Sequence, residues 1–284
     1  MATVLDGRKM SGEIEKRLKK KVASLPRAKR PKLVIIQIGD LEESNIYIKN
    51  KKVFGERIGV EVLHKRYPST GSGQAKEIEK KIVADILEFN KDRSVKGIMV
   101  QLPMPIHLDK RNILDAIDPI KDVDGLTSAS IKYLFDNTET FLPATTKAII
   151  KLLEIQKANF IGKKIVIVGL SALVGRPTAL ALLNRKATVL LCGRDTKNLA
   201  KETRAADILI VAAGHPNLIT AKHVKKGQIV IDIGINVIYK KGKRKIVGDV
   251  DFEKVKKIVK AITPVPGGVG PLTIACLFEN LLKA

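Results

Sequence analysis

Short runs of apolar, often β-branched residues alternate along the chain with longer segments in which apolar residues recur at helical spacing. KLVIIQIGD at 32–40 and VKGIMVQLP at 95–103 are two strongly apolar runs of this kind. Such runs are typical of buried strands, whereas the segments between them predict amphipathic helices. This alternation favours layers of helices packed on mainly parallel sheets, which is the α/β class.

The pattern divides into two units. Before residue 143 it predicts helices at 9–24, 44–58 and 74–90 and strands at 32–40, 60–67 and 95–103. From residue 143 it predicts helices at 145–157, 175–185 and 196–204 and strands at 163–169, 187–193, 207–214 and 228–235. Repeated strand–helix winding of the second kind is typical of a Rossmann-like parallel sheet with helices on both faces.

The last predicted helix, at 272–284, follows a loop rich in proline and glycine and is expected to pack back on the first unit. We therefore expect an α/β catalytic domain formed by residues 1–142 and 271–284, and a dinucleotide-binding domain at 143–270. Residues 103–125 are rich in Pro, Asp and Gly, which predicts a long ordered loop of the kind that often carries function.

Composition excludes several classes of protein. The chain has 284 residues, 45% of them apolar, which is enough for two packed cores. It has no run of 18 uncharged apolar residues and no signal-peptide core, so we expect no membrane span and a cytoplasmic protein. Cys192, Cys276 and the four histidines lack metal-ligand spacing, so no metal is expected.

The chain is strongly basic, with 52 lysine and arginine residues against 29 aspartate and glutamate residues, a formal charge of +23. Binding to nucleic-acid phosphates is one explanation. Solvated lysine-rich helix faces, as in EIEKRLKKK at 13–21, are another, because the excess is spread along the chain and only 4% of residues are aromatic. A positive field that steers anionic ligands is a third. We favour the solvated faces and expect no nucleic-acid partner.

A glycine-containing turn follows the first strand of the second unit. It begins at Gly169, passes through Leu170 and Ser171, and reaches Gly175 at the start of a helix. Backbone N–H groups at a helix start, together with the helix dipole, favour a pyrophosphate. The turn does not match G-x-G-x-x-G, so a simple tight turn remains the alternative.

The end of the next strand usually meets the adenosine ribose of a bound dinucleotide, and an acid there favours NAD. Here Arg194 stands at that point, where it can pair with a 2′-phosphate and so favours NADP. Asp195 can cap the following helix. An exposed surface charge is the alternative role for Arg194.

Tyr47 and Lys51 are four residues apart, so one helical turn places both on the same face. A phenol can stack on a flat heterocycle, and a lysine with a lowered pKa can transfer protons. The pair alone is weak evidence, because a surface tyrosine over a lysine stem has the same spacing. Short-chain dehydrogenases share the pair but place their glycine loop before the tyrosine, the reverse of the order here.

Polar residues also stand where ligands of α/β sheets collect. Gln101 directly follows a buried strand, and burying its amide is costly unless the amide is hydrogen-bonded. Asp122 and Asp124 offer two carboxylates in one turn, for which an Asx-turn or a calcium-like loop is the alternative. The segment Thr263–Thr273 combines rigid prolines with open glycines.

Together these segments resemble the bifunctional methylenetetrahydrofolate dehydrogenase/methenyltetrahydrofolate cyclohydrolase family. The matching segments are LDG at 5–7, Gly39 and Asp40, SNIYIKNK at 44–51, VQLP at 100–103, KDVDG at 121–125, the turn at 169–177, DIGIN at 232–236, GDV at 248–250 and TPVPGGVGPLT at 263–273. They span nearly the whole chain, and the last is the most specific.

The resemblance implies that Tyr47 packs on the folate ring system, that Lys51 is the central catalytic group and that Gln101 positions this lysine. Asp124 would hold the amino group and ring N–H of the pterin. Further substrate contacts are implied at Val100, Leu102, Pro266, Gly267, Gly268, Val269 and Gly270. Dinucleotide contacts are implied at Gly169, Leu170, Ser171, Arg194 and Ile235.

The implied activity is oxidation of 5,10-methylenetetrahydrofolate to 5,10-methenyltetrahydrofolate, with hydride transfer to NADP, followed by hydrolysis to 10-formyltetrahydrofolate. The resemblance also implies a homodimer formed through the cofactor domains, in the one-carbon metabolism that serves purine biosynthesis. Relatives with a small residue at the position of Leu170 and arginine at that of Arg194 use NADP, although NAD remains possible here. Thr146 stands where many members have proline.

Three alternatives remain open. Another two-domain NAD(P) dehydrogenase, such as an amino-acid dehydrogenase, would not need Lys51 and Gln101 beside the final proline–glycine loop. A nucleic-acid-binding protein with an inactive dinucleotide fold would show a continuous basic face. A family member with only the dehydrogenase activity is the third alternative, against which the presence of both Lys51 and Gln101 argues.

Overall fold

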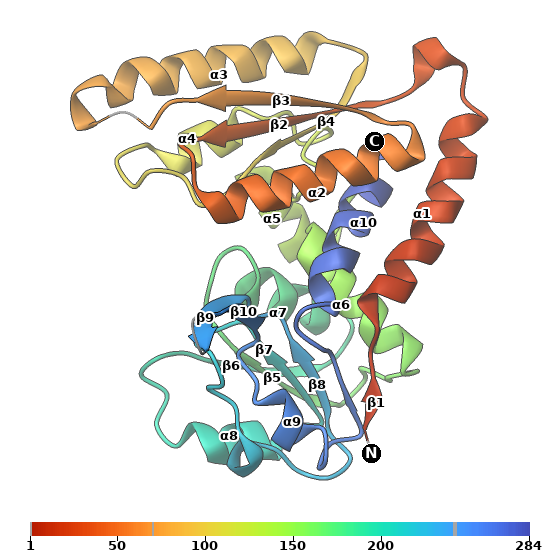
Figure 1. Cartoon of the computed structure of the whole chain (residues 1–284), viewed down its shortest axis with the longest axis vertical. Helices are drawn as coiled ribbons and strands as arrows, with labels where there is room; N and C mark the ends of the chain where they lie inside the picture. The colour runs from red at the N-terminus through yellow and green to blue at the C-terminus, as the bar shows by residue number, and fades with distance from the viewer. Residues whose placement is uncertain (1, 70, 241–242) are drawn as a thin grey trace. The chain divides into compact units, whose positions relative to one another are not determined.

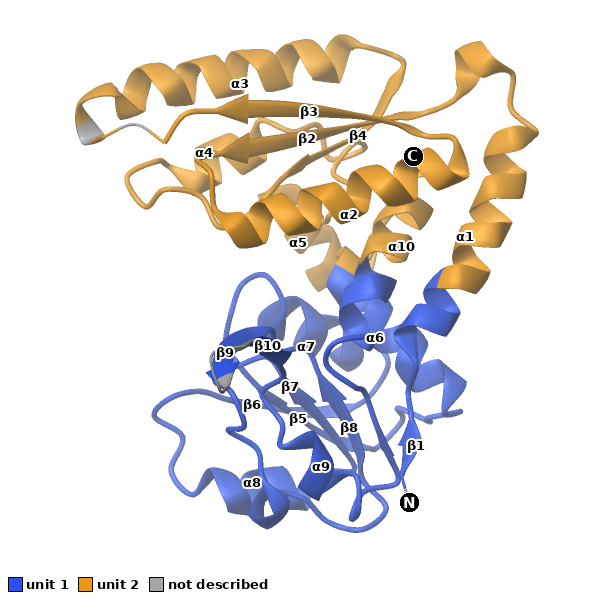
Figure 2. Ribbon diagram, viewed as in Figure 1, with its two compact units in different colours: residues 1–11, 145–273 blue, residues 12–144, 274–284 orange. Residues whose placement is uncertain are grey.

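The computed structural model describes residues 2–69, 71–240 and 243–284, and these divide into two compact units. Unit 1 consists of residues 1–11 and 145–273, and unit 2 consists of residues 12–144 and 274–284 (Figure 2). The α/β class and the two-unit organisation are confirmed.

Unit 1 is built on a six-stranded parallel sheet in the order β1-β11-β8-β7-β5-β6. Its strands are β1 (Thr3–Val4), β5 (Lys164–Val168), β6 (Thr188–Cys192), β7 (Ile208–Val211), β8 (Ile229–Asp232) and β11 (Ala261–Ile262). Its helical segments are α6 (Ala144–Ile155), which begins one residue before the unit, α7 (Gly175–Leu183), α8 (Leu199–Ala205) and α9 (Phe252–Val255). An antiparallel hairpin pairs β9 (Asn236–Lys240) with β10 (Lys243–Val247).

The alternating residues of these strands pack against helices on both faces of the sheet. On one face, Val166 and Val168 of β5 share an apolar cluster with Leu199 of α8 and Val255 of α9. Ile165 and Ile167 point to the opposite face and are fully buried, and α7 packs on β5 and β6 (Figure 1). The parallel dinucleotide-type sheet expected from the sequence is therefore present.

Unit 2 contains a parallel sheet in the order β3-β2-β4. Its strands are β2 (Lys32–Ile38), β3 (Glu61–Tyr67) and β4 (Val95–Val100). Its helices are α1 (Gly7–Ala23), whose first turn belongs to unit 1, α2 (Glu42–Ile58), α3 (Ala75–Lys91), α4 (Lys110–Asp115) and α5 (Ser128–Phe135). Short 3-10 turns occupy Arg27–Lys29, Ser72–Gln74 and, in unit 1, Ala221–His223.

The strands of unit 2 present different side chains to their two faces. Val34, Ile36 and Val100 join the apolar cluster that also contains Ile82 and Ile86 of α3. Residues at the alternate positions point to the opposite face, along which α2 runs. This division decides which strand residues can meet the helix that carries Lys51.

The C-terminal helix α10 (Val269–Leu281) packs on unit 2 through its second half, as the sequence predicts. The ring of Phe278 stacks on that of Phe54, with centroids 5.1 Å apart. The amide of Asn280 donates to the carbonyl oxygens of Val123 and Leu142, both at 2.9 Å.

The compact units differ at their ends from the expected domain boundaries. Residues 1–11 group with unit 1, because β1 pairs in parallel with β11. The boundary near the C-terminus falls after residue 273 instead of 270. The assignment of functions to residues 1–142 with 271–284 and to residues 143–270 stays a prediction.

Several elements differ from the sequence prediction. Residues 103–125 contain α4 in addition to irregular loop, and its start is capped by Asp109, whose carboxylate accepts from the N–H groups of Arg111 and Asn112. α8 begins at Leu199 instead of 196, after Asn198 with a left-handed φ of 53°. Asp195 is therefore not its cap.

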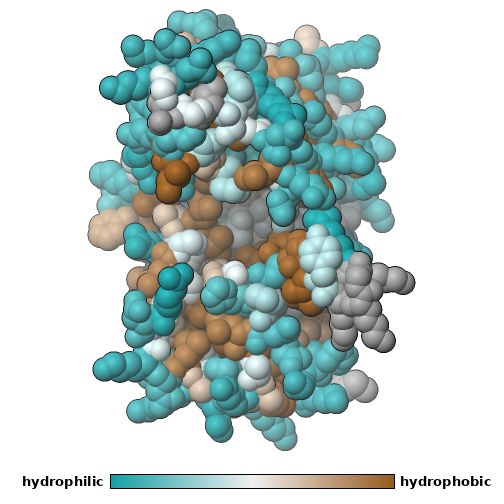
Figure 3. Space-filling model, turned by 60° about the vertical axis from the view of Figure 1, so that its left-hand side comes forward, coloured by the Kyte–Doolittle hydropathy of each residue, from teal (hydrophilic) through white to brown (hydrophobic). Residues whose placement is uncertain are grey.

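Among the described residues, no helix combines the length and apolar character that crossing a membrane requires. Hydrophilic side chains are spread over the visible face of each unit, with apolar residues between them (Figure 3).

Candidate active site and dinucleotide site

Lys51 lies on the buried stripe of α2. The helix begins with Glu42 and Glu43, whose charges suit its positive N-terminal end, and it ends at Gly59 with a left-handed φ of 81°. Its buried residues recur at helical spacing, namely Ser44, Ile48, Lys51, Phe54, Gly55 and Ile58. Lys51 is therefore carried into the protein interior, where it is only 8% exposed.

Gln101 receives the amine of this lysine. It follows β4 at the position that alternates away from the cluster of Val100, and its N–H donates to the carbonyl oxygen of Ile36 at 2.8 Å. The Nζ of Lys51 donates to Oε1 of Gln101 at 2.7 Å. The Nε2 of Gln101 donates to the carbonyl oxygen of Leu102 at 2.8 Å, which orients the amide so that its oxygen faces the lysine.

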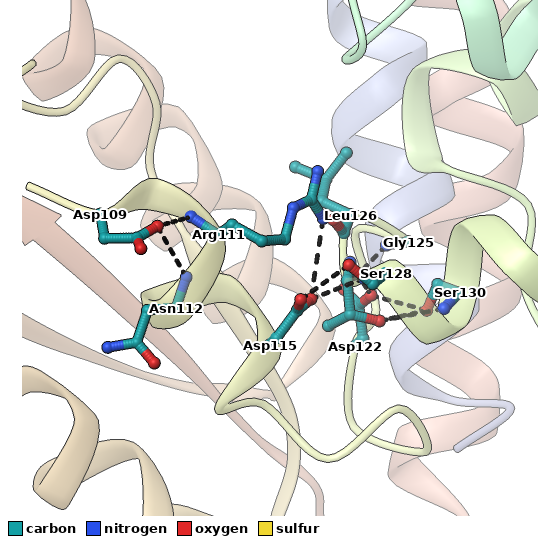
Figure 4. Close-up of polar contacts among 10 residues, drawn as sticks. Asp109, Arg111, Asn112, Asp115, Asp122, Gly125, Leu126, Ser128 and Ser130 are labelled. Carbon is teal, nitrogen blue, oxygen red and sulfur yellow. Dashed lines mark hydrogen bonds and ion pairs between the residues drawn. The ribbon is translucent and has the colours of Figure 1, made fainter.

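Asp122 organises the turn that contains both acids (Figure 4). Its Oδ1 accepts from the N–H of Gly125 at 2.9 Å, while its Oδ2 accepts from the N–H of Thr127 at 2.8 Å and from the hydroxyl of Ser130 at 2.7 Å. Asp122 is 1% exposed. The Asx-turn alternative is thus correct for Asp122, whose carboxylate is committed to the turn.

Helix α4 is hydrogen-bonded to the residues that directly follow the same turn. Asp115 accepts from the N–H and the hydroxyl of Ser128, at 2.6 and 2.7 Å. Arg111 donates to the carbonyl oxygen of Leu126 at 3.2 Å and pairs with Asp115 at 3.6 Å (Figure 4). A helix that the sequence did not predict therefore contributes to the loop that carries Asp124.

Asp124 and Lys51 interact electrostatically. Burial raises the pKa of Asp124 to about 6, although the lysine charge opposes this shift and Asp122 adds to it. Burial lowers the pKa of Lys51, and the carboxylate of Asp124 opposes this change. A buried amine with a lowered pKa, an amide acceptor and a carboxyl of raised pKa form a site that can move protons near neutral pH.

Tyr47 lies one turn before Lys51 on α2 and is half-buried, and burial raises the pKa of its phenol. Leu102 is also partly exposed. Val100, in contrast, points its side chain into the cluster on the α3 side of the sheet. A substrate contact at Val100 would have to use its main chain.

Ser44 is a buried polar residue of α2 that the sequence pattern alone does not identify as part of the site. It lies on the same stripe of α2 as Lys51 and is buried, and its hydroxyl oxygen has no hydrogen-bond partner among the described residues. A polar atom buried without a partner is costly. The seven-residue spacing from Lys51, two helical turns, was the available signal.

The turn from Gly169 to Gly175 in unit 1 is tightly built. Gly169 has a φ of 129°, and a Cβ there would lie 2.2 Å from the carbonyl oxygen of Ala212. A Cβ on Gly175 would lie 1.9 Å from the carbonyl oxygen of Gly169. The hydroxyl of Ser171 accepts from the N–H of Val174 at 3.1 Å, within the turn that precedes α7.

The remaining residues of the predicted dinucleotide site are exposed at the carboxyl ends of strands. Leu170 follows β5, Arg194 follows β6 and Ile235 follows β8. Leu170 lies over Gly193, where a Cβ would come within 2.5 Å of its side chain. An open glycine-lined edge with an exposed arginine fits a dinucleotide phosphate.

The predicted substrate contacts from Pro266 to Gly270 belong to unit 1. There the segment packs on the start of α1, since the N–H of Arg8 donates to the carbonyl oxygen of Gly267 at 3.1 Å. A Cβ on Gly7 would lie 1.8 Å from the carbonyl oxygen of Gly268. The LDG and PGG segments are therefore in direct contact.

The sequence and structure match known proteins along the whole chain. Residues 5–124 match the tetrahydrofolate dehydrogenase/cyclohydrolase catalytic domain, and residues 143–284 match the NAD(P)-binding domain of the same family. The bifunctional protein FolD of Nautilia profundicola is 42% identical over 99% of this chain and 96% of its own length.

Two solved structures are similar throughout. The FolD methylenetetrahydrofolate dehydrogenase/cyclohydrolase of Campylobacter jejuni has a TM-score of 0.93 at 44% identity, covering 100% of this chain and 98% of that one. The Trypanosoma brucei enzyme, complexed with NADP cofactor and inhibitor, has a TM-score of 0.93 at 32% identity, covering 99% and 96%. This chain belongs to the tetrahydrofolate dehydrogenase/cyclohydrolase family.

Proposed function

We propose that the chain oxidises 5,10-methylenetetrahydrofolate to 5,10-methenyltetrahydrofolate with NADP and then hydrolyses the product to 10-formyltetrahydrofolate. Family membership over the full length supports this pair of reactions. The observation that carries the second reaction is the buried Lys51 amine, bonded to Gln101 and influenced by Asp124.

In the first reaction a hydride leaves the methylene carbon that bridges N5 and N10 of the folate. NADP, when bound, accepts this hydride. No heteroatom proton has to be removed, so the protein mainly orients the folate. Tyr47 packs on the folate ring system, and Asp124 binds the pterin amino group and ring N–H. Leu102, the main chain of Val100 and residues 266–270 provide the remaining substrate contacts.

In the second reaction water attacks the methenyl carbon. As the bond from this carbon to N5 breaks and the formyl carbonyl forms, one water proton passes to N5 and the other is released. Lys51 is the group that handles this proton, and its lowered pKa makes the neutral amine more available. The cationic substrate disfavours the ammonium form further. Gln101 fixes the amine through its 2.7 Å hydrogen bond.

In this proposal the dinucleotide binds to unit 1 at Gly169, Leu170, Ser171, Arg194 and Ile235. The tight glycine turn supports a pyrophosphate site, and the exposed Arg194 supports recognition of a 2′-phosphate. These features favour NADP over NAD as the physiological acceptor.

A homodimer through unit 1 is also part of this proposal. β6 is the last strand of its sheet and pairs only with β5 among the described strands. It exposes Leu191, and the end of α7 exposes Leu183. An open edge strand beside exposed apolar residues is suited to pairing with a second copy.

The test compares the wild type with Lys51→Met in two assays. One follows NADPH formation from methylenetetrahydrofolate, and the other follows the decay of methenyl absorbance. We expect Lys51→Met to abolish methenyl hydrolysis, because no proton-transferring amine remains, while its melting temperature stays near that of the wild type. Lys52→Met, at the exposed neighbouring position, is the matched control. Wild-type hydrolysis by Lys51→Met would contradict the role of this lysine.

A further inference from the structure

Two buried carboxylates join the loops at the carboxyl edge of the sheet in unit 1. Asp232 ends β8, and Asp249 lies in the GDV segment after the β9–β10 hairpin. They are 2% and 0% exposed. Neither residue was among those implied for cofactor or substrate binding, although both stand in segments that match the family.

Asp249 joins the end of β7 to the segment after β8. Its Oδ2 accepts from the N–H groups of Ala213 and Gly214, at 2.7 and 2.9 Å. Its Oδ1 accepts from Nδ2 of Asn236 at 2.8 Å. The carboxylate of Asp249 therefore links the loop after β7 to the segment after β8.

Asp232 holds Asp249 in place. Its Oδ1 accepts from the N–H groups of Gly234 and Asp249, both at 3.0 Å, and its Oδ2 accepts from the N–H of Val250 at 3.0 Å. Its own N–H donates to the hydroxyl of Thr263 at 2.7 Å. Burial raises the pKa of Asp232 to about 7, the backbone donors oppose that shift, and Asp249 adds to it.

Two positions next to the carboxylates have room only for glycine. A Cβ on Gly234 would lie 2.2 Å from the carboxyl carbon of Asp249. A Cβ on Gly248 would lie 1.9 Å from Oδ2 of Asp232. The DIG and GDV segments are thus shaped around the two carboxylates.

Ile235 stands between the two residues that these acids hold. Gly234 before it is bound to Asp232, and Asn236 after it is bound to Asp249. At the other end, Ala213 follows Ala212, whose carbonyl oxygen packs against Gly169. We infer that Asp232 and Asp249 are positioning residues that fix Ile235 and the Ala212–Gly214 loop for binding of the dinucleotide. The inference rests on the proposed use of NADP by this edge.

The hydrogen-bond geometry predicts different tolerances to asparagine. At Asp249, an asparagine oxygen can keep both backbone donors while its NH₂ faces Asn236, whose amide can turn to present oxygen. At Asp232, both carboxylate oxygens accept from backbone N–H groups, so an NH₂ in either place meets a donor. Asp249→Asn should therefore be mild, while Asp232→Asn and Asp249→Ala should weaken binding.

The experiment measures the Kd of NADP by calorimetry, with methenyl hydrolysis and the melting temperature recorded on the same samples. We expect Asp232→Asn and Asp249→Ala to raise the Kd by about tenfold or more, because each leaves backbone donors unsatisfied. Asp249→Asn should stay within about threefold of the wild type. Methenyl hydrolysis should be unchanged in each, because neither carboxylate is bonded to Lys51, Gln101 or the proposed substrate contacts at 266–270. Asp251→Asn, two residues after Asp249, is the matched control.

A reciprocal exchange decides the question even where Asp232→Asn fails to fold. Asn236→Asp sets two carboxylates against each other and should raise the Kd of NADP. Adding Asp249→Asn restores a donor facing an acceptor and should return the Kd toward the wild-type value. Unchanged NADP affinity in Asn236→Asp, no recovery in the double variant, or a parallel loss of hydrolysis would overturn the inference. A wild type that binds neither NADP nor NAD would instead contradict the proposed function.

Discussion

The charge of Lys51 lowers the pKa of Asp124, and the charge of Asp124 raises the pKa of Lys51. This coupling can be tested without measuring turnover. Burial lowers the pKa of Lys51, and the Asp124 carboxylate partly offsets this by favouring the ammonium form. Asp124→Asn removes that negative charge, so the pKa of Lys51 should fall further below its ordinary value. We predict that the pH at which Lys51 becomes reactive toward an amine-acylating reagent, followed by mass spectrometry, shifts downward in this variant.

The same labelling experiment contains its own reference. Lys52 is exposed and should label with the same pH dependence in the wild type and in Asp124→Asn. An unchanged or upward-shifted profile for Lys51 would show that the carboxylate does not stabilise its ammonium form.

Arg194 is the residue on which the choice between NADP and NAD depends in this proposal. A charge-assisted contact to a 2′-phosphate contributes roughly 1.5–3 kcal/mol, which corresponds to a tenfold or greater change in affinity. Arg194→Ala should therefore raise the KM for NADP by about tenfold or more and leave the KM for NAD nearly unchanged. Arg204→Ala, an exposed arginine on α8, should alter neither value. Equal effects of Arg194→Ala on both cofactors would exclude the phosphate contact.

At the scale of elements, the KDVDG segment carries a charged residue of distinct function at each of three positions. Lys121 donates to the carbonyl oxygens of Phe89, Asn90 and Asp92, at 2.7–3.0 Å, and so ties the loop to the end of α3. Asp122 stabilises the turn through its hydrogen bonds, and Asp124 interacts electrostatically with Lys51. The position of Asp124 thus depends on contacts that Asp124 does not make itself.

We predict that Asp122→Asn raises the KM for the folate substrate while leaving the Kd of NADP unchanged. An asparagine NH₂ must face at least one backbone donor that the carboxylate now accepts, which costs about 1–3 kcal/mol and disturbs the turn. The melting temperature should fall by several degrees. Asp136→Asn, which removes an exposed ion pair at the end of α5, should change little. A normal folate KM with a lowered melting temperature would assign Asp122 a role in stability alone.

Local sequence patterns predict where Lys51 and Gln101 lie in their elements, whereas their pairing is implied by the resemblance to the family. Helical spacing identifies the stripe of α2, and the end of an apolar strand identifies the place of Gln101. The sequence does not predict β1 and β11, since two-residue strands have no periodicity and exist only through pairing with distant residues. The positioning role of Asp232 and Asp249 cannot be predicted from the sequence for a similar reason. Their hydrogen-bond partners are backbone N–H groups of loops that only the tertiary fold brings together.

At the scale of the whole molecule, the charge of +23 agrees with solvated lysine-rich surfaces. A few of the described lysines pair with an acid three or four residues away along the chain, as Lys91 does with Glu88 and Lys256 with Glu253. Such exposed pairs contribute little to stability. Both proposed ligands are anions, so the remaining positive field favours their approach, and association should slow as salt is added.

The open edge of β6 determines the oligomeric state that we expect. Leu191 on this strand is 37% exposed, and a charge placed there would lose its hydration if a second copy covered the strand. We predict that the wild type sediments at about twice its chain mass of 31.1 kDa and that Leu191→Lys sediments as a monomer. As a control, Leu87→Lys places the same charge at a 47% exposed position on α3 of unit 2, outside the unit that contains β6. This variant should remain dimeric. Methenyl hydrolysis, whose proton-transferring amine lies in unit 2 and not in the unit that contains β6, should persist in the monomeric variant and show that the chain is still folded. A wild type that sediments at the mass of one chain, or a Leu191→Lys variant that still sediments as a dimer, would show that β6 is not the contact.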